Sequence, residues 1–408
     1  MRATQRNILL LAVAQGFLLT NGVTLVAVNG LVGVSLAPTL WLATFPVTAY
    51  VIGAALTTLP AAFFMKRHGR RAGFMLGSTF GMAGALTSAF AVSIGSFWLL
   101  CAGTLMAGAY NAFGQQYRFA AADAAELTWK SRAISLTLAG GILGGVIGPA
   151  LSTHTRTLLE PTFMASYLVL AVFAFLSLLL ASRLDIPPLS STEQHARGRP
   201  LAEIARQPRF IVAVLAAACG YGVMNLLMTA TPIAMDLCRY PFADAAFVLE
   251  WHVIGMFAPS FFTGHLIRRF GVLPILFAGA LLNFACIAIA LSGASVTHFW
   301  WALTLLGVGW NFLYIGGTTL LTETYRPEEK AKAQGFNDFL VFAVQGITSL
   351  SSGVLITGEG WNTLNLIAIP AVTITAFATM TLWWRQRASR RAAGALPDEA
   401  PSARDNIN

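Results

Sequence analysis

Apolar runs of about the length needed to cross a membrane follow one another along the whole chain. Twelve such runs alternate with short polar segments, at 7–28, 40–64, 73–94, 97–119, 133–153, 163–183, 209–231, 246–267, 272–293, 298–321, 335–357 and 362–384. A helix needs about 20 predominantly apolar residues to cross the hydrocarbon core. The runs lack the period-two alternation of barrel strands, and only helices or closed barrels satisfy their backbone groups in lipid. The pattern therefore predicts an all-α membrane protein with twelve transmembrane helices.

Composition supports the same class. Hydrophobic residues make up 56% of the 408 residues and charged residues only 11%, whereas soluble domains carry about 25% charge. Four scattered cysteines without metal-site spacing are expected to be small buried hydrophobes. We therefore expect contact with membrane lipids and no metal site, cofactor or nucleic-acid partner.

The positive charges predict the orientation of the spans. If the N-terminus is cytoplasmic, 24 of the 26 Lys and Arg residues fall on cytoplasmic segments and only Arg156 and Arg239 fall on outer loops. Such an excess is typical of cytoplasmic loops. The basic balance is thus explained by topology, and we expect a multi-pass protein of the plasma (inner) membrane with both termini in the cytoplasm.

The twelve spans divide into two similar halves. At an offset of 202 residues, Gly69 aligns with Gly271, Trp98 with Trp300 and Gly144 with Gly346. Weak internal symmetry of this kind is typical of transporters built from parallel repeats. We expect an N-terminal six-helix half at 1–183, a cytoplasmic linker at 184–208, a C-terminal half at 209–384 and a disordered tail at 385–408.

Two loops identify a family resemblance. The segment Lys66-Arg67-His68-Gly69-Arg70-Arg71 resembles the signature loop of the major facilitator superfamily at Arg67, Gly69, Arg70 and Arg71, and the loop after span 8 matches it at Gly264, Leu266, Arg269 and Gly271. The segment before span 11, residues 328–335, resembles the family's loop between spans 10 and 11. The resemblance covers nearly the whole chain. It implies a monomeric secondary transporter of bacterial type, with two six-helix bundles related by a pseudo-two-fold axis.

The first signature loop departs from the family pattern at one charge. Lys66 stands where the family has Asp, and Thr104 stands at the span 4 position where proton-coupled members have Arg. An acid, Asp338, opens span 11, which in the family fold lies near the first signature loop. We therefore expect a gate in which Lys66 or Arg67 pairs with Asp338; the alternative is that the basic loop only fixes orientation.

Other ionisable residues near the spans are few, and such residues are functional candidates because they are costly in a membrane. His252, next to Glu250 and Trp251, is a candidate for proton coupling, against the alternative of an interfacial belt. Arg118 and Asp123 flank the inner end of span 4 and are counted among the gate candidates; snorkelling or structural pairing is favoured there over substrate contact.

A stripe of small residues runs along span 5. Gly140, Gly144 and Gly148 share one helix face and allow close approach of another helix, either as fixed packing or as a moving interface. Pro149 follows them and is expected to bend or end the span near its outer side.

Neutral polar and aromatic residues provide the candidates for a substrate cavity. Family cavities are lined by spans 1, 4, 7 and 10, and these spans contribute Gln15, Asn21, Asn111, Gln115, Tyr221, Asn225, Trp310, Asn311 and Tyr314. Interhelical packing is the alternative for each of them. As a set, they favour a small neutral or amphipathic organic solute held by hydrogen bonds and stacking.

The absence of a phosphate-binding GxxxxGK[ST] loop excludes direct driving by ATP, and dispersed histidines argue against a membrane enzyme. We expect alternating access. Proton-coupled efflux is the first hypothesis, because Gly144, Gly148 and Pro149 in span 5 resemble the Gly-x-x-x-Gly-Pro element of the family's antiporters. Uptake of a small metabolite is the alternative, since the span 4 arginine is missing. A transporter-like sensor is a remote third.

Overall fold

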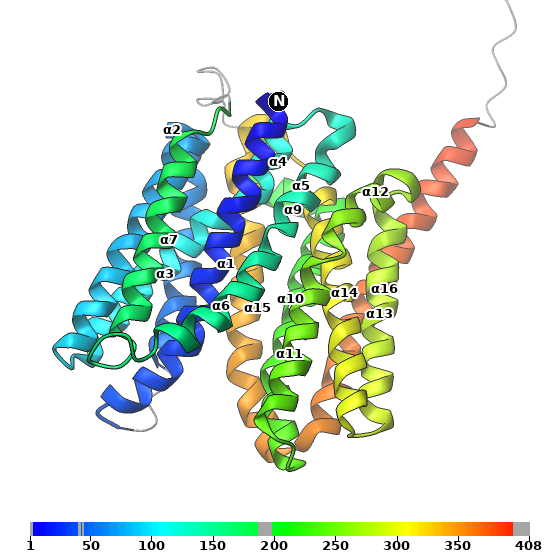
Figure 1. Cartoon of the computed structure of the whole chain (residues 1–408). Coiled ribbons are helices and arrows are strands. Elements are labelled where there is room, and N and C mark those ends of the chain that lie inside the picture. Colours follow the sequence, from blue (N-terminus) through cyan, green and yellow to red (C-terminus); the bar gives the residue numbers. More distant parts are fainter. Residues whose placement is uncertain (1–2, 40–41, 43–44, 187–197, 395–408) are drawn as a thin grey trace, which may run out of the picture.

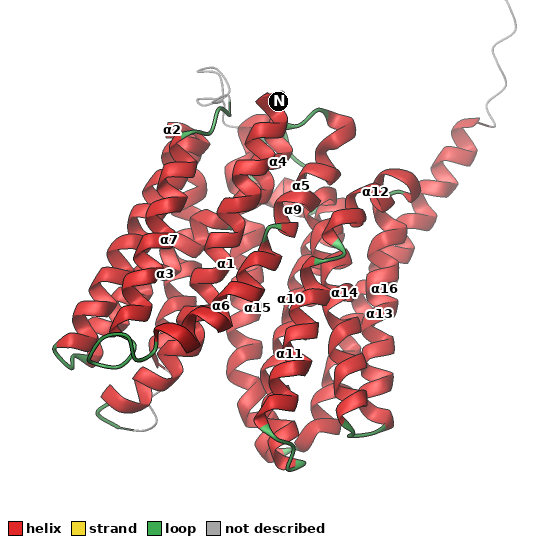
Figure 2. Ribbon diagram, viewed as in Figure 1, coloured by secondary structure: helices red, strands yellow, loops and turns green. Residues whose placement is uncertain are grey.

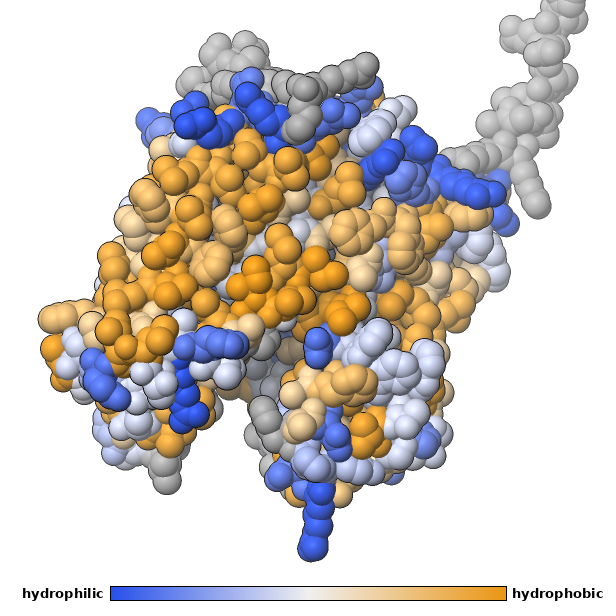
Figure 3. Space-filling view, in the orientation of Figure 1, coloured by the Kyte–Doolittle hydropathy of each residue, from blue (hydrophilic) through white to orange (hydrophobic). Residues whose placement is uncertain are grey.

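The computed structural model describes residues 3–39, 42, 45–186 and 198–394. Within these ranges the chain forms helices and contains no strand (Figure 2). An apolar belt covers the middle of the visible surface, between hydrophilic ends (Figure 3). The protein is a multi-pass membrane protein, as the apolar runs predicted.

Seven helices are described in the N-terminal half. They are α1 (Ala3–Leu36), α2 (Phe45–Ser93), α3 (Phe97–Gly114), α4 (Tyr117–Ala124), α5 (Lys130–Ala139), α6 (Gly141–Thr155) and α7 (Met164–Ser182), with a short 3-10 turn at Leu127–Trp129. Two predicted spans, 97–119 and 133–153, are each divided into a pair of helices, α3 with α4 and α5 with α6.

The C-terminal half is preceded by a short helix, α9 (Leu201–Ala205). It consists of α10 (Pro208–Leu237), α11 (Phe242–Phe257), α12 (Ser260–Phe270), α13 (Val272–Ser292), α14 (Val296–Leu321), α15 (Lys330–Gly358) and α16 (Gly360–Gly394), with a 3-10 turn at Pro327–Glu329. The start of α1 and the end of α16 lie at the same end of the molecule (Figure 1).

Helix α2 holds two of the predicted spans, which join at Gly69. The backbone there has φ 84° and ψ 163°, and Gly271, between α12 and α13, has φ 92° and ψ 162°. This region of backbone space is essentially restricted to glycine. The two aligned glycines thus make the same sharp turn in each half, which explains why both positions lack a side chain.

Length and composition alone pick out eight of the described helices as long and apolar enough to cross a membrane, or nine with the bent pair α11 and α12. The twelve-span fold also counts α2 twice and includes α3 with α4, and α15. These last two carry polar residues such as Asn111 and Asp338, which lowers their hydropathy.

Two boundaries differ from the sequence expectation. Helix α16 continues to Gly394, so residues 385–394 are helical rather than disordered, and residues 395–408 lie outside the described residues. Helix α6 continues past Pro149 to Thr155, so this proline does not end span 5; the helix break lies at Gly140 instead. Membrane helices tolerate proline because neighbouring groups can satisfy the freed backbone. Of the expected linker, residues 187–197 lie outside the described residues.

Candidate functional site

A cavity lies between the two halves. Its lining comes from α1, α2, α3, α5, α10, α11 and α14, and it encloses about 370 Å³ of empty space including its open mouth. The lining residues are Gln15, Leu18, Leu19, Gly22, Tyr50, Asn111, Gln115, Leu138, Tyr221, Phe257, Trp310 and Tyr314. None of them is charged, so the cavity suits a solute without net charge.

Aromatic rings form one wall of this cavity. Trp310 and Tyr314 are stacked with ring centroids 4.9 Å apart and an interplanar angle of 20°, and Tyr221 meets Tyr314 edge-on at 5.1 Å. Phe257 packs edge-on against Trp310 at 5.6 Å. The Nε1 group of Trp310 is buried and has no hydrogen-bond partner among the described residues. A planar ring with a hydrogen-bond acceptor would complement this wall.

Amide side chains supply the polar contacts. The Gln115 amide nitrogen donates to the Asn111 side-chain oxygen at 3.2 Å, and the Tyr314 hydroxyl donates to the Gln115 oxygen at 2.9 Å. On α1, Gln15, Leu18, Leu19 and Gly22 follow the i, i+3, i+4, i+7 spacing of one helix face. A few placed amides among apolar and aromatic side chains are typical of small-molecule sites.

Six of the nine predicted cavity residues line this cavity, and three lie elsewhere. Asn311 bonds the Met256 carbonyl and the Ser260 hydroxyl, both at 2.6 Å, and Asn225 bonds the Gln345 carbonyl at 3.1 Å. Asn21 bonds its own helix at Phe17. The amides of Asn311 and Asn225 join neighbouring helices, and none of the three is among the cavity-lining residues. Helix phase explains the outcome for Asn311, which lies about 100° around the helix from Trp310, whereas Tyr314 shares its face.

Sequence reasoning missed Tyr50, Leu138 and Phe257 and the apolar residues of α1. The signal for α1 was present, because 15, 18, 19 and 22 share one face with Gln15. No signal pointed to Tyr50 or Phe257, since the sequence does not tell whether an aromatic residue in a membrane span faces lipid or a cavity.

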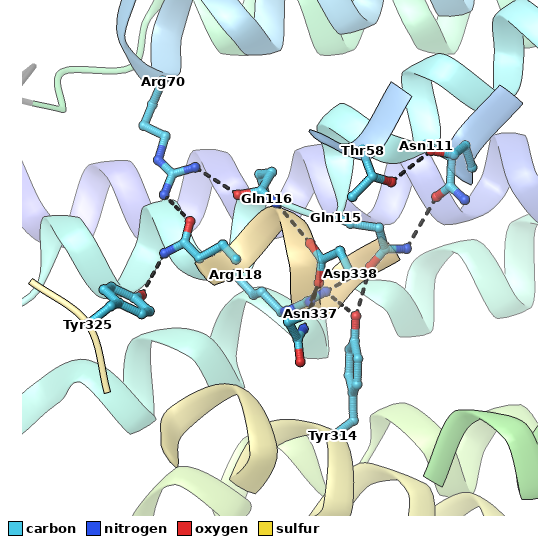
Figure 4. A network of polar contacts seen from close by, with 12 residues as sticks. Thr58, Arg70, Asn111, Gln115, Gln116, Arg118, Tyr314, Tyr325, Asn337 and Asp338 are labelled. Carbon is cyan, nitrogen blue, oxygen red and sulfur yellow. Dashed lines mark hydrogen bonds and ion pairs between the residues drawn. The ribbon is translucent and has the colours of Figure 1, made fainter. Parts of the chain in front are cut away.

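Next to the cavity, a buried ion pair joins the two halves. Arg118 of α4 donates to Asp338 of α15, and their side chains are only 1% and 2% exposed. Gln116 donates to the other Asp338 oxygen at 2.8 Å, and Asn337 donates to the first at 2.9 Å (Figure 4). Arg118 also contacts Tyr314 and Gln115 of the cavity. A buried charge needs this kind of compensation.

A second layer of polar contacts extends this network toward the turn at Gly69. Arg70 bonds Asp123 at 3.1 Å, Gln116 at 2.9 Å and Gln334 of α15 at 2.7 Å. Lys330 at the start of α15 reaches Asp123 at 2.8 Å. We call the whole set the charged gate; its members are Arg70, Gln116, Arg118, Asp123, Lys330, Gln334 and Asp338.

The expected partner of Asp338 was therefore wrong. The acid pairs with Arg118. It lies eight residues into α15, about one turn beyond Gly335, which packs against Leu59 and Ala62 of α2. Arg118 is buried against the opposite half, so it does not snorkel. From the signature loop it is Arg70 that reaches α15, through Gln334.

A second contact between the halves uses no charge. Ser135 of α5 donates to the Ser260 carbonyl of α12 and accepts from the Gly264 N–H at 3.1 Å, and Ser131 donates to the Gly264 carbonyl at 3.2 Å. A Cβ at Gly264 would lie 2.6 Å from the Arg132 Cα. We call Ser131, Ser135, Ser260 and Gly264 the serine gate. Figure 3 shows the molecule notched between its halves at the end opposite to the termini.

The glycine stripe of span 5 packs inside the N-terminal half. Added Cβ atoms at Gly140 and Gly144 would lie 1.8 Å from the Ala12 carbonyl oxygen and 2.5 Å from the Leu19 Cβ of α1, and Gly148 faces Val23. The neighbouring Gly141 and Gly145 instead face Phe257 and Val253 of the other half. The predicted stripe thus packs against α1 within the N-terminal half, and the contact with the opposite half belongs to the next face of the helix.

His252 and Glu250, the candidates for proton coupling, lie apart from the cavity lining. His252 is fully buried, with its Nδ1 2.7 Å from the Leu303 carbonyl oxygen and no partner at Nε2 among the described residues. Glu250 is exposed. Trp251 meets Trp300 edge-on at 5.5 Å, in an aromatic cluster with Trp301.

The linker is fastened to the C-terminal half. Arg199 donates to both carboxylate oxygens of Glu329, which is buried just before α15, and Lys332 donates to the Arg199 carbonyl. The Arg199 guanidinium, together with backbone N–H donors, lowers the pKa of Glu329 to about 2. The carboxylate therefore stays charged, and the start of α15 stays tied to the linker, throughout the physiological range.

These features define a class of membrane protein: a transporter with a central cavity closed on one side by contacts between two helical halves. The sequence model of the family "Major Facilitator Superfamily" matches residues 8–258 and 242–405. The chain belongs to this family. It is a transporter and not an enzyme.

Relatives and solved structures agree with this assignment. "Riboflavin transporter RfnT" of Brucella anthropi is 43% identical over 375 residues, which cover 91% of this chain and 94% of the relative. "Uncharacterized MFS-type transporter YdeG" of Bacillus subtilis is 28% identical over 89% of the chain and 88% of its own length. The fold resembles a crystal structure of the transporter FucP in the outward conformation, with TM-score 0.77 and 18% identity over 93% of this chain and 99% of that one.

Proposed function

We propose that this protein transports riboflavin, or a close flavin analogue, by alternating access. The observation that carries the proposal is the neutral cavity in which the stacked pair Trp310 and Tyr314 lies beside the amides of Gln15, Asn111 and Gln115. Riboflavin is an uncharged molecule with a planar three-ring system, an imide edge and a polyol chain. The name of the Brucella anthropi relative supports the same substrate.

Each part of the solute has a matching group in the cavity. The ring system fits a wall of aromatic faces, since aromatic pairs favour stacked or edge-on contacts. The imide edge presents one N–H donor between two carbonyl acceptors, and amide side chains offer both donors and acceptors. The unpartnered Trp310 Nε1 would donate to one of these carbonyls. No described lining residue needs a charge on the solute.

A binding measurement tests the proposal. Purified protein is titrated with riboflavin and quenching of flavin fluorescence is followed, with ribitol, which resembles the polyol chain without the rings, as competitor control. We expect saturable quenching that ribitol does not relieve. Asn111→Ala removes one cavity amide and should weaken the affinity about 5-fold, the value of one hydrogen bond.

Asn311→Ala is the matched control for Asn111→Ala. It removes the same side chain from α14 of the other half, at a position that bonds Met256 and Ser260 and does not line the cavity. We expect a lower melting temperature and an unchanged riboflavin affinity. If Asn311→Ala weakened riboflavin binding and Asn111→Ala did not, the cavity assignment would be overturned.

We propose further that the basic end of the molecule faces the cytoplasm and that flux is proton-linked through Asp338. Of the described residues, Asp338 is the carboxylate buried within a membrane span, and its protonation would remove one charge of the pair that closes the cavity. In proteoliposomes loaded with riboflavin, an imposed pH gradient should change the flux, and the sign of the change separates efflux from uptake. Flux that ignores the gradient in both directions would exclude proton coupling.

A further inference from the structure

Two cavity residues also hold the buried arginine of the charged gate. One Arg118 nitrogen, Nη1, donates to the Gln115 oxygen at 2.9 Å and to the Tyr314 hydroxyl. Its other terminal nitrogen, Nη2, donates to Asp338. The Arg118 guanidinium carbon also lies 4.5 Å from the centroid of the Tyr314 ring. The cavity wall and the gate therefore share side chains.

The hydrogen bonds of Arg118 go to Gln115, Tyr314 and Asp338. Its Nε is already buried without a hydrogen-bond acceptor among the described residues. A ligand can donate to the Gln115 oxygen in place of Arg118, or displace the Tyr314 hydroxyl. In either case the buried Arg118 guanidinium keeps fewer hydrogen bonds. Leaving a buried charged donor unsatisfied costs more than an ordinary hydrogen bond contributes. Occupying the cavity would then destabilise the closed form of the gate.

The cavity wall offers a ligand both a stacking surface and an unpartnered hydrogen-bond donor. Trp310 stacks on Tyr314, and its buried Nε1 needs an acceptor. An imide edge that accepts from Trp310 would bring its own N–H donor to the same wall, where the Gln115 oxygen is an acceptor now used by Arg118 and Tyr314. The ligand and Arg118 compete for one oxygen.

We propose that Gln115 and Tyr314 are positioning residues that couple substrate binding to the opening of the charged gate, by exchanging their hydrogen bonds between Arg118 and the substrate. This inference rests on the proposed function for the identity of the ligand, but the contact of Tyr314 with Arg118 does not depend on it. A substitution that removes one of these hydrogen bonds to Arg118 should open the gate without ligand. By linkage, adding ligand should then open the gate by a smaller factor.

Tyr314→Phe makes that change, because it keeps the ring that stacks on Trp310 and removes the hydroxyl. Spin labels are placed at Arg71 and Arg268, two exposed positions at the basic end of the two halves, in a variant whose four cysteines are replaced. Distances are measured with and without saturating riboflavin. In the otherwise unchanged protein, riboflavin should raise the population with the longer distance.

In Tyr314→Phe we expect that population to be raised about 5-fold without any ligand, the effect of one lost hydrogen bond. Riboflavin should add less than half of the original increment, while its affinity changes by less than about 3-fold, since the stacking contact remains. Gln115→Met, which removes both polar atoms at similar size, should show the same loss of response.

Tyr167→Phe is the matched control. It removes an equally buried tyrosine hydroxyl, which donates to Asn29 at 2.6 Å inside the N-terminal half. We expect its distances to match those of the unchanged protein in both conditions. Ligand-free distances in Tyr314→Phe and Gln115→Met that equal the control would overturn the coupling. If riboflavin fails to bind the unchanged protein, the proposed substrate is wrong, and the ligand-free comparison still decides the coupling.

Discussion

The charged gate and the serine gate close the same end of the cavity by different physical means. The charged gate joins side chain to side chain, with the buried pair of Arg118 and Asp338 at its centre. In the serine gate, the hydroxyls of Ser131 and Ser135 bond backbone groups of α12 at a glycine. The first contact depends on charge and on every partner that satisfies it, whereas the second depends on how closely two helices approach.

This difference predicts that the two gates have different roles. A buried charge pair is strongly affected when one partner is lost, because the remaining charge is uncompensated. A hydroxyl bonded to backbone leaves, when removed, groups that can still bond within their own helix. We therefore expect the charged gate to respond to ligand and protons, and the serine gate to act as a close-packed pivot.

The largest expected effect comes from Asp338→Asn. Arg118 would stay buried without its counter-charge, and breaking such a pair costs roughly 3–5 kcal/mol. We expect a markedly lower melting temperature and riboflavin flux reduced at least about 10-fold, measured by thermal unfolding and by counterflow in proteoliposomes.

The control for Asp338→Asn removes both charges at once. The double variant Arg118→Met with Asp338→Leu should recover most of the melting temperature, because replacing both partners by apolar groups is often neutral. It should not recover the ligand response. If the single variant unfolds at the same temperature as the original protein, the ion pair does not stabilise the closed form.

Gly264→Ala should have the next largest effect, through sterics alone. The new methyl group would lie 2.6 Å from the Arg132 Cα and 2.8 Å from the Ser131 carbonyl oxygen, so α5 and α12 must separate. We expect the closed population to fall, as seen by the same spin-label distances. Gly30→Ala is the matched control, since its Cβ meets nothing within 4 Å; an equal response of the two variants would contradict the close-packing role.

Ser135→Ala should have a smaller effect than Gly264→Ala. It removes the hydroxyl that bridges the Ser260 carbonyl and the Gly264 N–H, and that carbonyl and N–H belong to one step of the α12 helix ladder. We expect a change of about 5-fold or less in the ratio of closed to open forms, the value of one hydrogen bond. A loss as large as that of Asp338→Asn would remove the distinction between the two gates.

On the ratio of closed to open forms, we expect the smallest effect from Glu329→Gln, which tests whether the charged gate depends on the contact between the linker and the start of α15. The pKa of Glu329, about 2, lies below its ordinary value of 4.5, so its contribution to stability is present above about pH 4.5 and is lost as the pH falls toward 2. The melting temperatures of the original protein and Glu329→Gln should differ by a constant amount from pH 8 to pH 5 and converge at lower pH.

Glu203→Gln serves as control for Glu329→Gln. Glu203 also pairs with Arg199, at 4.0 Å, and its side chain is 58% exposed. Exposed pairs contribute little, so we expect no shift of melting temperature at any pH. A pH-independent difference for Glu329→Gln would show that the Arg199 contact does not stabilise through the carboxylate charge.

The sequence by itself determined the membrane class, the helical fold and the two-half symmetry, because hydropathy and backbone constraints act locally. Gly69 and Gly271 illustrate this: one 202-residue offset located two turns that only glycine can make. The family resemblance followed from the same local signals. The broad nature of the cavity, neutral and aromatic, could also be predicted, because few charges occur anywhere in the spans.

Only the tertiary structure decided which residues meet across the halves. Asn311 and Trp310 are neighbours in sequence but face different surfaces. The sequence allowed Asp338 to pair with Lys66 as well as with Arg118, and the position of α15 along α2 decided for Arg118. Hydropathy reports how a residue partitions between lipid and protein, but it carries no information on helix rotation or on the level at which two helices touch. Those two quantities determine that Tyr314 and Gln115 join the cavity to the gate.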